Sequence, residues 1–234
     1  MNKKQHQREV REQKQALADK KAANQKKMIL GGSVLLIAII AFAVIRMMAI
    51  SPPTVSEVVA GDHVKGNPDA LVTLIEYSDL QCPACRAQSD VIAKAWPPIK
   101  NSVRFVYRHF PLTQTHPHAL EAAYYAEAAA LQGKFWEMHD LMFAQQQQWS
   151  RLKDVTPVFD GFVANLGLDK EQFAKDVVSA AVKEKVATDL QSAKSARVAA
   201  TPSFFLNGEP LTDIGTPDKL KEAIRLALIE AQKN

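Results

Sequence analysis

Two cysteines, Cys82 and Cys85, stand three positions apart, directly after an apolar run and a short polar turn. They are the only cysteines in the 234 residues, so a disulfide within the chain can form only between these two thiols. Two thiolates are too few for a four-cysteine zinc site. A cysteine pair between a predicted strand and a predicted helix suits a dithiol that cycles between thiol and disulfide. The alternative is a disulfide that only fastens a turn, or two buried free thiols.

The helical pattern begins at the cysteine pair, and this placement predicts different roles for the two thiols. A helix N-terminus carries unpaired N–H groups and about half a positive charge, which stabilise a thiolate and lower its pKa. We expect Cys82 to lie exposed before the first turn as the nucleophile, and Cys85 to lie within the turn and resolve the mixed disulfide. Pro83 suits the first turn because its missing N–H would be unpaired there. With Ala84 it forms the active-site turn.

The strand that precedes the cysteines, residues 71–77, is almost entirely apolar, which is typical of a central strand covered on both faces. Glu76 interrupts it, and a carboxylate in a buried strand is costly unless it has a partner or a task. Because Glu76 lies six positions before Cys82, it is a candidate proton relay beneath the active-site helix. The alternative is a paired or an outward-facing carboxylate. Asp79 is expected to serve the turn.

The neighbouring segments predict an α/β fold. Residues 55–64 are expected to hold a short strand, and a turn follows at 66–69. After the cysteines, a helical pattern runs to Trp96 and is expected to end at Pro97-Pro98. Residues 102–110 then alternate as a strand. Strand, helix and strand in this order make a βαβ unit, whose crossover should be right-handed.

Several histidines raise the question of a metal site. His109, His116 and His118 follow the second strand, but no carboxylate or thiolate shares their spacing, so loop and capping roles are favoured and no metal is expected. His139 lies on an apolar helical stripe. This favours a buried, hydrogen-bonded histidine, and a proton shuttle is the alternative.

Residues 117–198 have a helical pattern throughout. Gln145–Gln148 within this segment is expected to be a solvated helix end. Asp169, with Gln172 three positions on, is expected to start one helix that continues through Leu190.

The C-terminal part returns to strand patterns. Residues 201–210 predict a strand that ends in a tight Asn-Gly hairpin turn. A last strand is expected near 211–214, and Thr216 is expected to cap a final amphipathic helix.

Charge and hydropathy separate the N-terminal region from the rest of the chain. Residues 1–27 hold nine Lys/Arg against three Asp/Glu, a net +6, whereas the chain from residue 51 onward carries −3. The segment 28–45 has no charge and, at the helical rise, covers about 27 Å, nearly a bilayer core, and apolar residues continue beyond it. We expect an uncleaved anchor with the basic tail in the cytoplasm and the remainder outside. A cleaved signal peptide is the alternative. Because the basic charge lies in the tail, it does not support nucleic-acid binding by the domain.

The chain therefore divides into four expected parts. These are a cytoplasmic basic tail at 1–27, a transmembrane anchor at 28–50, a linker with a short first strand at 51–65, and a domain at 66–234 whose helical insertion covers about 117–198.

These motifs together resemble a known family. The Cys-Pro-Ala-Cys turn, the Thr-Pro before a strand, and the terminal hairpin and helix resemble the thioredoxin fold. The long helical insertion resembles the DsbA-like branch of thiol:disulfide oxidoreductases. Residues 133–140, Gly-Lys-Phe-Trp-Glu-Met-His-Asp, are similar to a stretch in its membrane-anchored bacterial members. The resemblance covers about residues 55–231 and implies a thioredoxin fold with a helical insertion. With the apolar segment at 28–50, the expected fold is preceded by a single transmembrane helix.

The resemblance also assigns roles to residues. It implies that Pro202 follows a cis peptide bond and lies against the cysteines, and that Thr201 offers backbone groups to an extended substrate. It places Glu76 at the family's buried acidic position. One departure is Ala84, since the periplasmic oxidant of the family has histidine after the proline.

The expected function is an extracytoplasmic thiol:disulfide oxidoreductase of the bacterial cytoplasmic (inner) membrane, which introduces disulfides into secreted or envelope proteins. No cofactor is implied, because the dithiol is itself the redox group. The expected partners are unfolded or folding secreted proteins and a membrane redox partner, either a quinone-linked oxidase or a membrane reductase. The alternatives are a reductase or isomerase of the same fold, or a non-redox chaperone or binding module tethered to the membrane.

Overall fold

The two apolar segments on either side of the cysteine pair form the centre of a mixed sheet in the computed structural model, which describes residue 55 and residues 57–233. The expected basic tail and membrane anchor lie outside the described residues. Within the part of the chain that is described, no helix has both the length and the apolar character needed to span a membrane.

The sheet contains strands from both ends of the described chain. Its strands, in spatial order β1-β3-β2-β4-β5, are β1 (His63–Gly66), β3 (Val103–His109), β2 (Val72–Ser78), β4 (Ser203–Leu206) and β5 (Glu209–Leu211). β2 and β3 pair in parallel, and the other neighbours pair antiparallel. The parallel pair and the helix between them make the predicted βαβ unit.

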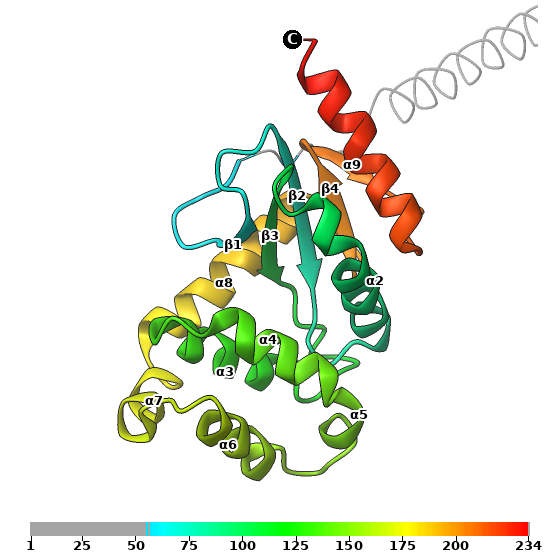
Figure 1. The fold of residues 1–234 in the computed structure, drawn as a ribbon. Helices are drawn as coiled ribbons and strands as arrows, with labels where there is room; N and C mark the ends of the chain where they lie inside the picture. The colour runs from blue at the N-terminus through cyan, green and yellow to red at the C-terminus, as the bar shows by residue number, and fades with distance from the viewer. Residues whose placement is uncertain (1–54, 56, 234) are drawn as a thin grey trace, which may run out of the picture. The chain divides into compact units, whose positions relative to one another are not determined.

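Helices cover the sheet and extend beyond it (Figure 1). They are α2 (Pro83–Ile99), α3 (Ala119–Leu131), α4 (Phe135–Ala144), α5 (Gln146–Trp149), α6 (Thr156–Asn165), α7 (Lys170–Asp176), α8 (Ala180–Ser195) and α9 (Pro217–Ala231). α2 and α9 lie against one face of the sheet, and α8 lies against the other (Figure 1). The other helices of the insertion form a separate layer beyond the end of the sheet where β2 and β3 finish (Figure 1).

The alternation of side chains along β2 decides what lies beneath the active-site helix. Val72 and Leu74 pack with α2 and α9, while Ile75 and Tyr77 pack with α8. Successive side chains of a strand point to opposite faces. Glu76 is therefore in phase with Leu74 and lies on the face that α2 covers.

The first strand differs from its prediction. It was expected within 55–64, but β1 is His63–Gly66 and includes the first residue of the expected turn. Gly66 has φ +96°, and a Cβ there would lie 2.4 Å from the carbonyl oxygen of Val103, so only glycine fits where β1 meets β3. Val55 instead makes an isolated bridge with Gly208.

Two helix boundaries were predicted wrongly. α2 continues past Pro97 and Pro98 to Ile99, because the prolines lie in its last turn and buried Ile99 packs in the core beneath it. The expected single helix from Asp169 is two helices, since Ser179 caps a new helix by accepting from the N–H of Val182. The cap at Asp169 is confirmed, as its side chain accepts from the N–H of Gln172 at 2.9 Å.

The C-terminal hairpin is confirmed at the predicted turn. Asn207 and Gly208 both have positive φ, 48° and 93°, as a tight two-residue hairpin requires. The strand that follows is Glu209–Leu211, earlier than expected, because pairing resumes immediately after this turn. Thr216 caps α9 by accepting from the N–H of Lys219 at 3.3 Å.

Candidate active site

The turn between β2 and α2 is built around Asp79. Its Oδ1 accepts from the N–H of Gln81 at 2.7 Å, and its carbonyl accepts from the N–H of Cys82 at 3.0 Å. Oδ2 accepts from the N–H of Leu112 and lies 2.7 Å from Nδ1 of His116. The prediction that Asp79 serves the turn is confirmed, and the carboxylate also ties the turn to the segment after β3.

The two cysteines begin α2 in the predicted arrangement. Cys82 is the N-cap with extended backbone, Pro83 occupies the first turn, and Cys85 lies inside it. Pro83 and Ala84 are exposed. The expectation that Cys82 is exposed is wrong: only 6% of it is accessible, against 0% of Cys85, because it packs in the core cluster of the helical insertion and against Thr201.

Thr201 and Pro202 meet the cysteine pair although they lie far from it in the sequence. The peptide bond between them is cis, as the resemblance implied. In its protonated form the thiol of Cys82 donates to the carbonyl oxygen of Thr201 at 3.6 Å. The structure thus brings the cysteine pair and the Thr-Pro segment together, with a backbone carbonyl beside the sulfur.

The two thiols have opposite acid strengths. The pKa of Cys82 is lowered to about 5, chiefly by the hydrogen bond from Cys85 and further by Thr201 and the N–H groups of Cys85 and Ala84, while burial opposes the shift. Burial raises the pKa of Cys85, and its hydrogen bond to Cys82 adds to this. The N–H of Asp79 also donates to the Cys85 sulfur at 3.5 Å. At neutral pH the pair therefore holds one thiolate on Cys82 and one proton on Cys85.

Glu76 lies buried on the α2 face of the sheet, with only 2% of it accessible. It makes no ion pair with any described residue, and its Oε1 has no hydrogen-bond partner there, so the alternative of a paired or outward-facing carboxylate is wrong. Burial raises its pKa to about 8, the charge of Cys82 adds to this, and Ser78 opposes it. Glu76 is thus protonated at neutral pH near the two thiols.

Gln146 supports the active-site turn from the helical insertion. It was expected to be solvated, but only 3% is accessible, and its amide donates to the carbonyls of Leu80 at 2.8 Å and Cys82 at 3.0 Å. One indication was available in the sequence, since Gln146 lies on the same helical face as the apolar Met142 and Trp149. Without knowledge of the partner carbonyls, this spacing does not distinguish a supporting amide from a solvated one.

Gln146→Leu should destabilise the protein by about 1–3 kcal/mol, because it leaves two carbonyls of a buried turn without their donor. The free energy of unfolding measured with urea checks this. Gln147→Leu is the matched control, since Gln147 is exposed on the same short helix and should change stability by about 0.5 kcal/mol or less. Equal effects of the two substitutions would contradict the supporting role of Gln146.

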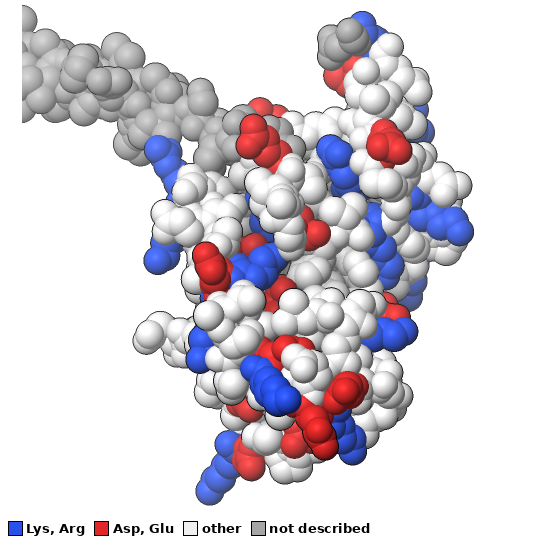
Figure 2. Space-filling view, turned by 90° about the vertical axis from the view of Figure 1, so that its left-hand side faces the viewer, with Lys and Arg blue, Asp and Glu red and all other residues white. Residues whose placement is uncertain are grey.

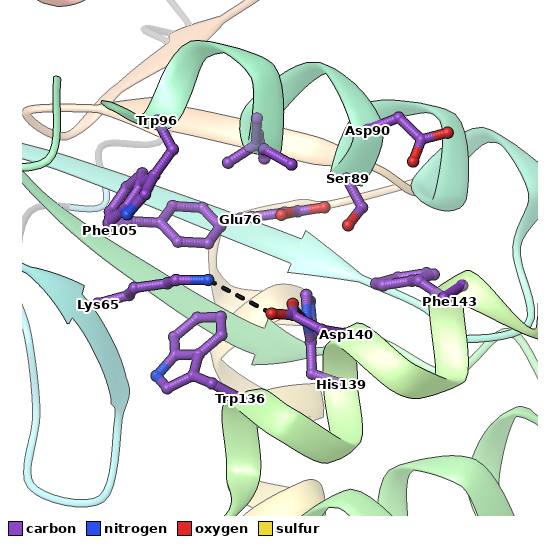
Figure 3. A pocket seen from close by; sticks show the side chains of 13 residues that line it. Lys65, Glu76, Ser89, Asp90, Trp96, Phe105, Trp136, His139, Asp140 and Phe143 are labelled. Carbon is purple, nitrogen blue, oxygen red and sulfur yellow. Dashed lines mark hydrogen bonds and ion pairs between the residues drawn. The ribbon is translucent and has the colours of Figure 1, made fainter. Parts of the chain in front are cut away.

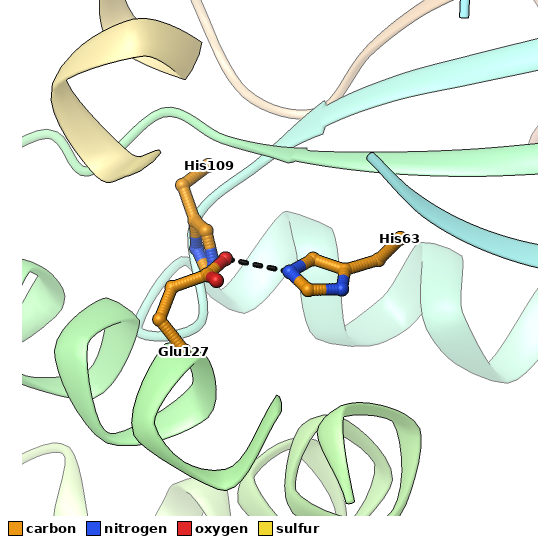
Figure 4. A group of neighbouring side chains, drawn as sticks. All are labelled: His63, His109 and Glu127. Atoms are coloured by element: carbon orange, nitrogen blue, oxygen red, sulfur yellow. Dashed lines mark hydrogen bonds and ion pairs between the residues drawn. The ribbon is translucent and has the colours of Figure 1, made fainter. Parts of the chain in front are cut away.

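His109 does not share a group with His116 and His118, the histidines that follow it in sequence, but it belongs to another cluster. His109 lies with His63 of β1 and Glu127 of α3 (Figure 4), and their ligand-type atoms all lie within 4.8 Å of one another. Oε1 of Glu127 is 2.7 Å from Nε2 of His63 and 2.9 Å from Nε2 of His109. Nζ of Lys185 lies 3.9 Å from the same oxygen and 2.6 Å from Asp189.

The ammonium of Lys185 makes a network of hydrogen bonds and ion pairs the better interpretation of this group, because it places a positive charge beside the carboxylate. The network links β1 and β3 to the helices of the insertion. His118 is not part of this network, and its Nε2 lies 2.8 Å from the carbonyl oxygen of Leu152.

On the face shown in Figure 2, basic and acidic side chains are mixed, with apolar and neutral side chains between them. Arg86, the basic residue nearest the cysteines in sequence, donates through Nε to the carbonyl of Phe143 at 3.1 Å. Its guanidinium thus joins α2 to α4.

A mixed sheet, a dithiol at the start of α2, and a facing Thr-Pro segment together define a protein of the thioredoxin-fold class with a helical insertion. The family model described as thioredoxin matches residues 59–225. The chain therefore belongs to the thioredoxin family.

Solved structures of DsbA-type proteins share this fold. The oxidised form of BdbD from Bacillus subtilis superposes with a TM-score of 0.66 at 21% identity, covering 75% of this chain and 97% of that one. Alpha-DsbA1 from Wolbachia pipientis gives 0.65 at 21% identity, covering 75% and 94%. DsbA2 from Pseudomonas aeruginosa gives 0.56 at 24%, covering 73% and 96%. The fold is DsbA-like, and at these identities the likeness concerns the fold alone.

Relatives of higher identity carry a different name. The "Na(+)/H(+) antiporter NhaA 1" of Mycolicibacterium gilvum is 40% identical over 152 residues, which is 63% of this chain and 24% of that protein. The "Na(+)/H(+) antiporter NhaA 3" of Salinispora tropica is 41% identical over 147 residues, 63% of this chain and 22% of that protein. The chain spans about a quarter of the length of these curated relatives.

Proposed function

We propose that the protein is a thiol:disulfide oxidoreductase that introduces disulfides into secreted or envelope proteins. The observation that carries the proposal is the asymmetry of the dithiol: the pKa of Cys82 is lowered and that of Cys85 is raised. A thiolate with a low pKa leaves readily from a mixed disulfide, so the protein passes its disulfide on and ends reduced. The DsbA-like fold supports the same class of reaction.

The reaction proceeds by two exchanges at Cys82. A substrate thiolate attacks the Cys82 sulfur, the Cys82–Cys85 bond breaks, and its electron pair goes to Cys85, which takes a proton. A second substrate thiolate then attacks the substrate sulfur of the mixed disulfide and expels Cys82 as a thiolate. The substrate leaves with one disulfide, and the protein holds two reduced cysteines. Glu76, protonated and close to both thiols, is the proposed proton donor to Cys85.

Ala84 sets an upper limit on the oxidising strength. Its methyl group adds neither charge nor a side-chain donor beside the thiolate, and oxidising power follows stabilisation of the reduced form. The pKa of Cys82, about 5, lies between the free value of about 8.5 and the roughly 3.5 of DsbA. We therefore expect a reduction potential between about −120 mV and −270 mV, the values for DsbA and thioredoxin.

Ala84→His should raise the reduction potential by about 30 mV or more, a tenfold change in the equilibrium constant, because it adds a charge and a donor beside the thiolate. Titration against glutathione measures the potential, with thiolate absorbance followed against pH. Ala174→His adds the same side chain at an exposed position on α7 and should leave the potential unchanged. A wild-type potential at or below that of thioredoxin would favour the reductase alternative.

We propose that residues 1–27 are cytoplasmic, that 28–50 anchor the chain in the inner membrane, and that the domain works outside. The basic tail next to an apolar segment supports this orientation. An exported-enzyme reporter fused after residue 234 should be active, and a reporter that works only in the cytoplasm should be silent. The reverse result would contradict both the orientation and disulfide donation, since cytosol keeps such dithiols reduced.

The remaining alternatives differ in what they require of the cysteines. A non-redox chaperone or binding module has no need of thiols of unequal pKa, so those shifts favour exchange chemistry. We do not propose ion transport for this protein on the basis of the antiporter relatives, because the match covers 24% or less of those proteins. The proposed partners remain folding secreted proteins and a membrane redox partner that reoxidises the dithiol.

A further inference from the structure

A pocket of about 340 Å³ lies between α2, α4 and the sheet, on the face that carries Glu76 (Figure 3). Its walls are largely aromatic, and its polar groups come from separate elements. The aromatic residues are Trp96, Phe105, Trp136 and Phe143, and the polar ones include Lys65, Glu76, His139 and Asp140. In Figure 3 the carboxyl of Glu76 projects into this space from β2, and His139 rises toward it from α4.

Two buried polar atoms of the pocket residues lack partners within the described structure. These are Oε1 of Glu76 and Nε2 of His139, and the accessible fractions of the two residues are 2% and 5%. A buried polar atom without a hydrogen bond is costly, and polar cavities of this size take water that supplies the bond. Water in the pocket can therefore connect the carboxyl to the imidazole.

The other ring nitrogen of His139 faces the exit. Nδ1 lies 2.8 Å from Oδ1 of Asp140, whose side chain is 57% exposed. The ammonium of Lys65 lies 3.6 Å from Oδ2 and over the rings of Trp96 and Trp136. With Nδ1 donating to Asp140, Nε2 is left as an acceptor toward the interior. One imidazole thus joins a buried carboxyl to a carboxylate in contact with solvent.

We propose that His139 carries protons between Glu76 and bulk solvent, with Asp140 as the outer group and pocket water as the inner link. The inference rests on the proposed function. When the Cys82–Cys85 bond breaks, Cys85 takes the proton of Glu76. In the disulfide form the imidazole of His139 carries its proton on Nε2. Nδ1 then takes a proton from solvent through Asp140 while Nε2 gives its proton through the water to the Glu76 carboxylate, which leaves the Nδ1–H form that pairs with Asp140 beside the free thiols. Reoxidation moves one proton in the opposite direction.

The charges around His139 are compatible with this role. Burial lowers its pKa, Asp140 of the same helix opposes the shift, and Lys65 of β1 and His109 of β3 add to it. Glu76 of β2 and Asp90 of α2 complete the ionisable groups of the pocket. The imidazole is therefore neutral at neutral pH and charged only while a proton passes.

The test is single-turnover reduction of the disulfide form of the full chain by dithiothreitol from pH 5 to 8, with free thiols counted after an acid quench. His139→Gln should slow reduction about tenfold, below the general acid–base contribution of 10²–10⁴ because water retains part of the path. Its equilibrium potential should stay unchanged, since a proton path alters rates alone. Asp140→Asn, at an exposed side chain, should slow reduction less and fold normally.

His63→Gln is the matched control, because His63 is also largely buried and paired with a carboxylate but does not line the pocket. It should reduce at the wild-type rate. Imidazole added to His139→Ala should restore the rate in proportion to its concentration. Wild-type rates in His139→Gln, or equal slowing in His63→Gln, would overturn the relay. If His139→Gln does not fold, unchanged rates in Asp140→Asn would do so. Absence of reduction in the wild type would instead overturn the proposed function.

Discussion

Cys82→Ser should reduce disulfide exchange to the uncatalysed background, while Cys85→Ser, given a substrate that already contains a disulfide, should remain joined to it as a mixed disulfide through Cys82. The two serines remove different steps, because Cys82 supplies the low-pKa thiolate and Cys85 only resolves or releases it. Oxidative refolding of a reduced secreted protein, followed by its gain of activity, measures the first effect. Non-reducing electrophoresis after alkylation detects the trapped complex.

Both variants must be shown to keep the fold of the wild type. Serine is close in volume to cysteine, and its hydroxyl group can also make hydrogen bonds where the sulfurs contact each other, Thr201 and the N–H of Asp79. Each variant should therefore unfold in urea within about 1–2 kcal/mol of the reduced wild type. Exchange that persists in folded Cys82→Ser would exclude Cys82 as the nucleophile. Complexes trapped by Cys82→Ser rather than Cys85→Ser would reverse the two roles.

The parts of the site that sequence could predict are local ones. The order of strand, turn and helix around Cys82 and Cys85 depends on neighbouring residues, and so does the Asn207-Gly208 hairpin. The position of Glu76 on the α2 face also follows from alternation along a strand whose register is set by its apolar neighbours. Each of these features is decided within about ten residues of chain.

The parts that sequence could not predict depend on contacts across the fold. The amide of Gln146 meets the carbonyl of Cys82 from 64 residues away, and the carbonyl of Thr201 covers the Cys82 sulfur from 119 residues away. His109 pairs with Glu127 rather than with the histidines that follow it in sequence, because β3 ends beside α3. The hydropathy of a single residue does not indicate which distant residue it will contact. In this site those distant contacts determine how deeply a group is buried and hence its pKa.

The largest expected effect on stability concerns Glu76. Burial raises its pKa in the folded protein to about 8, whereas an unfolded chain has the ordinary value of about 4.5. Between these values the folded state holds a proton that the unfolded state has lost, so stability falls as the pH rises through this window. Below it both states are protonated, and above it both are charged and the loss is complete. The wild type should therefore lose up to about 1.4 kcal/mol per pH unit relative to Glu76→Gln.

The comparison is made on the disulfide form, in which neither thiol titrates, so that burial, opposed by Ser78, determines the pKa of Glu76 without the charge of Cys82. Urea unfolding from pH 4 to 9 should give curves for wild type and Glu76→Gln that meet at low pH and separate as pH rises. Glu184→Gln, at an exposed position on α8, should follow the wild type. Reduction of the disulfide in Glu76→Gln should also be slower, since the amide cannot give Cys85 a proton. Parallel stability curves together with unchanged reduction rates from pH 5 to 8 would leave Glu76 with a purely structural role.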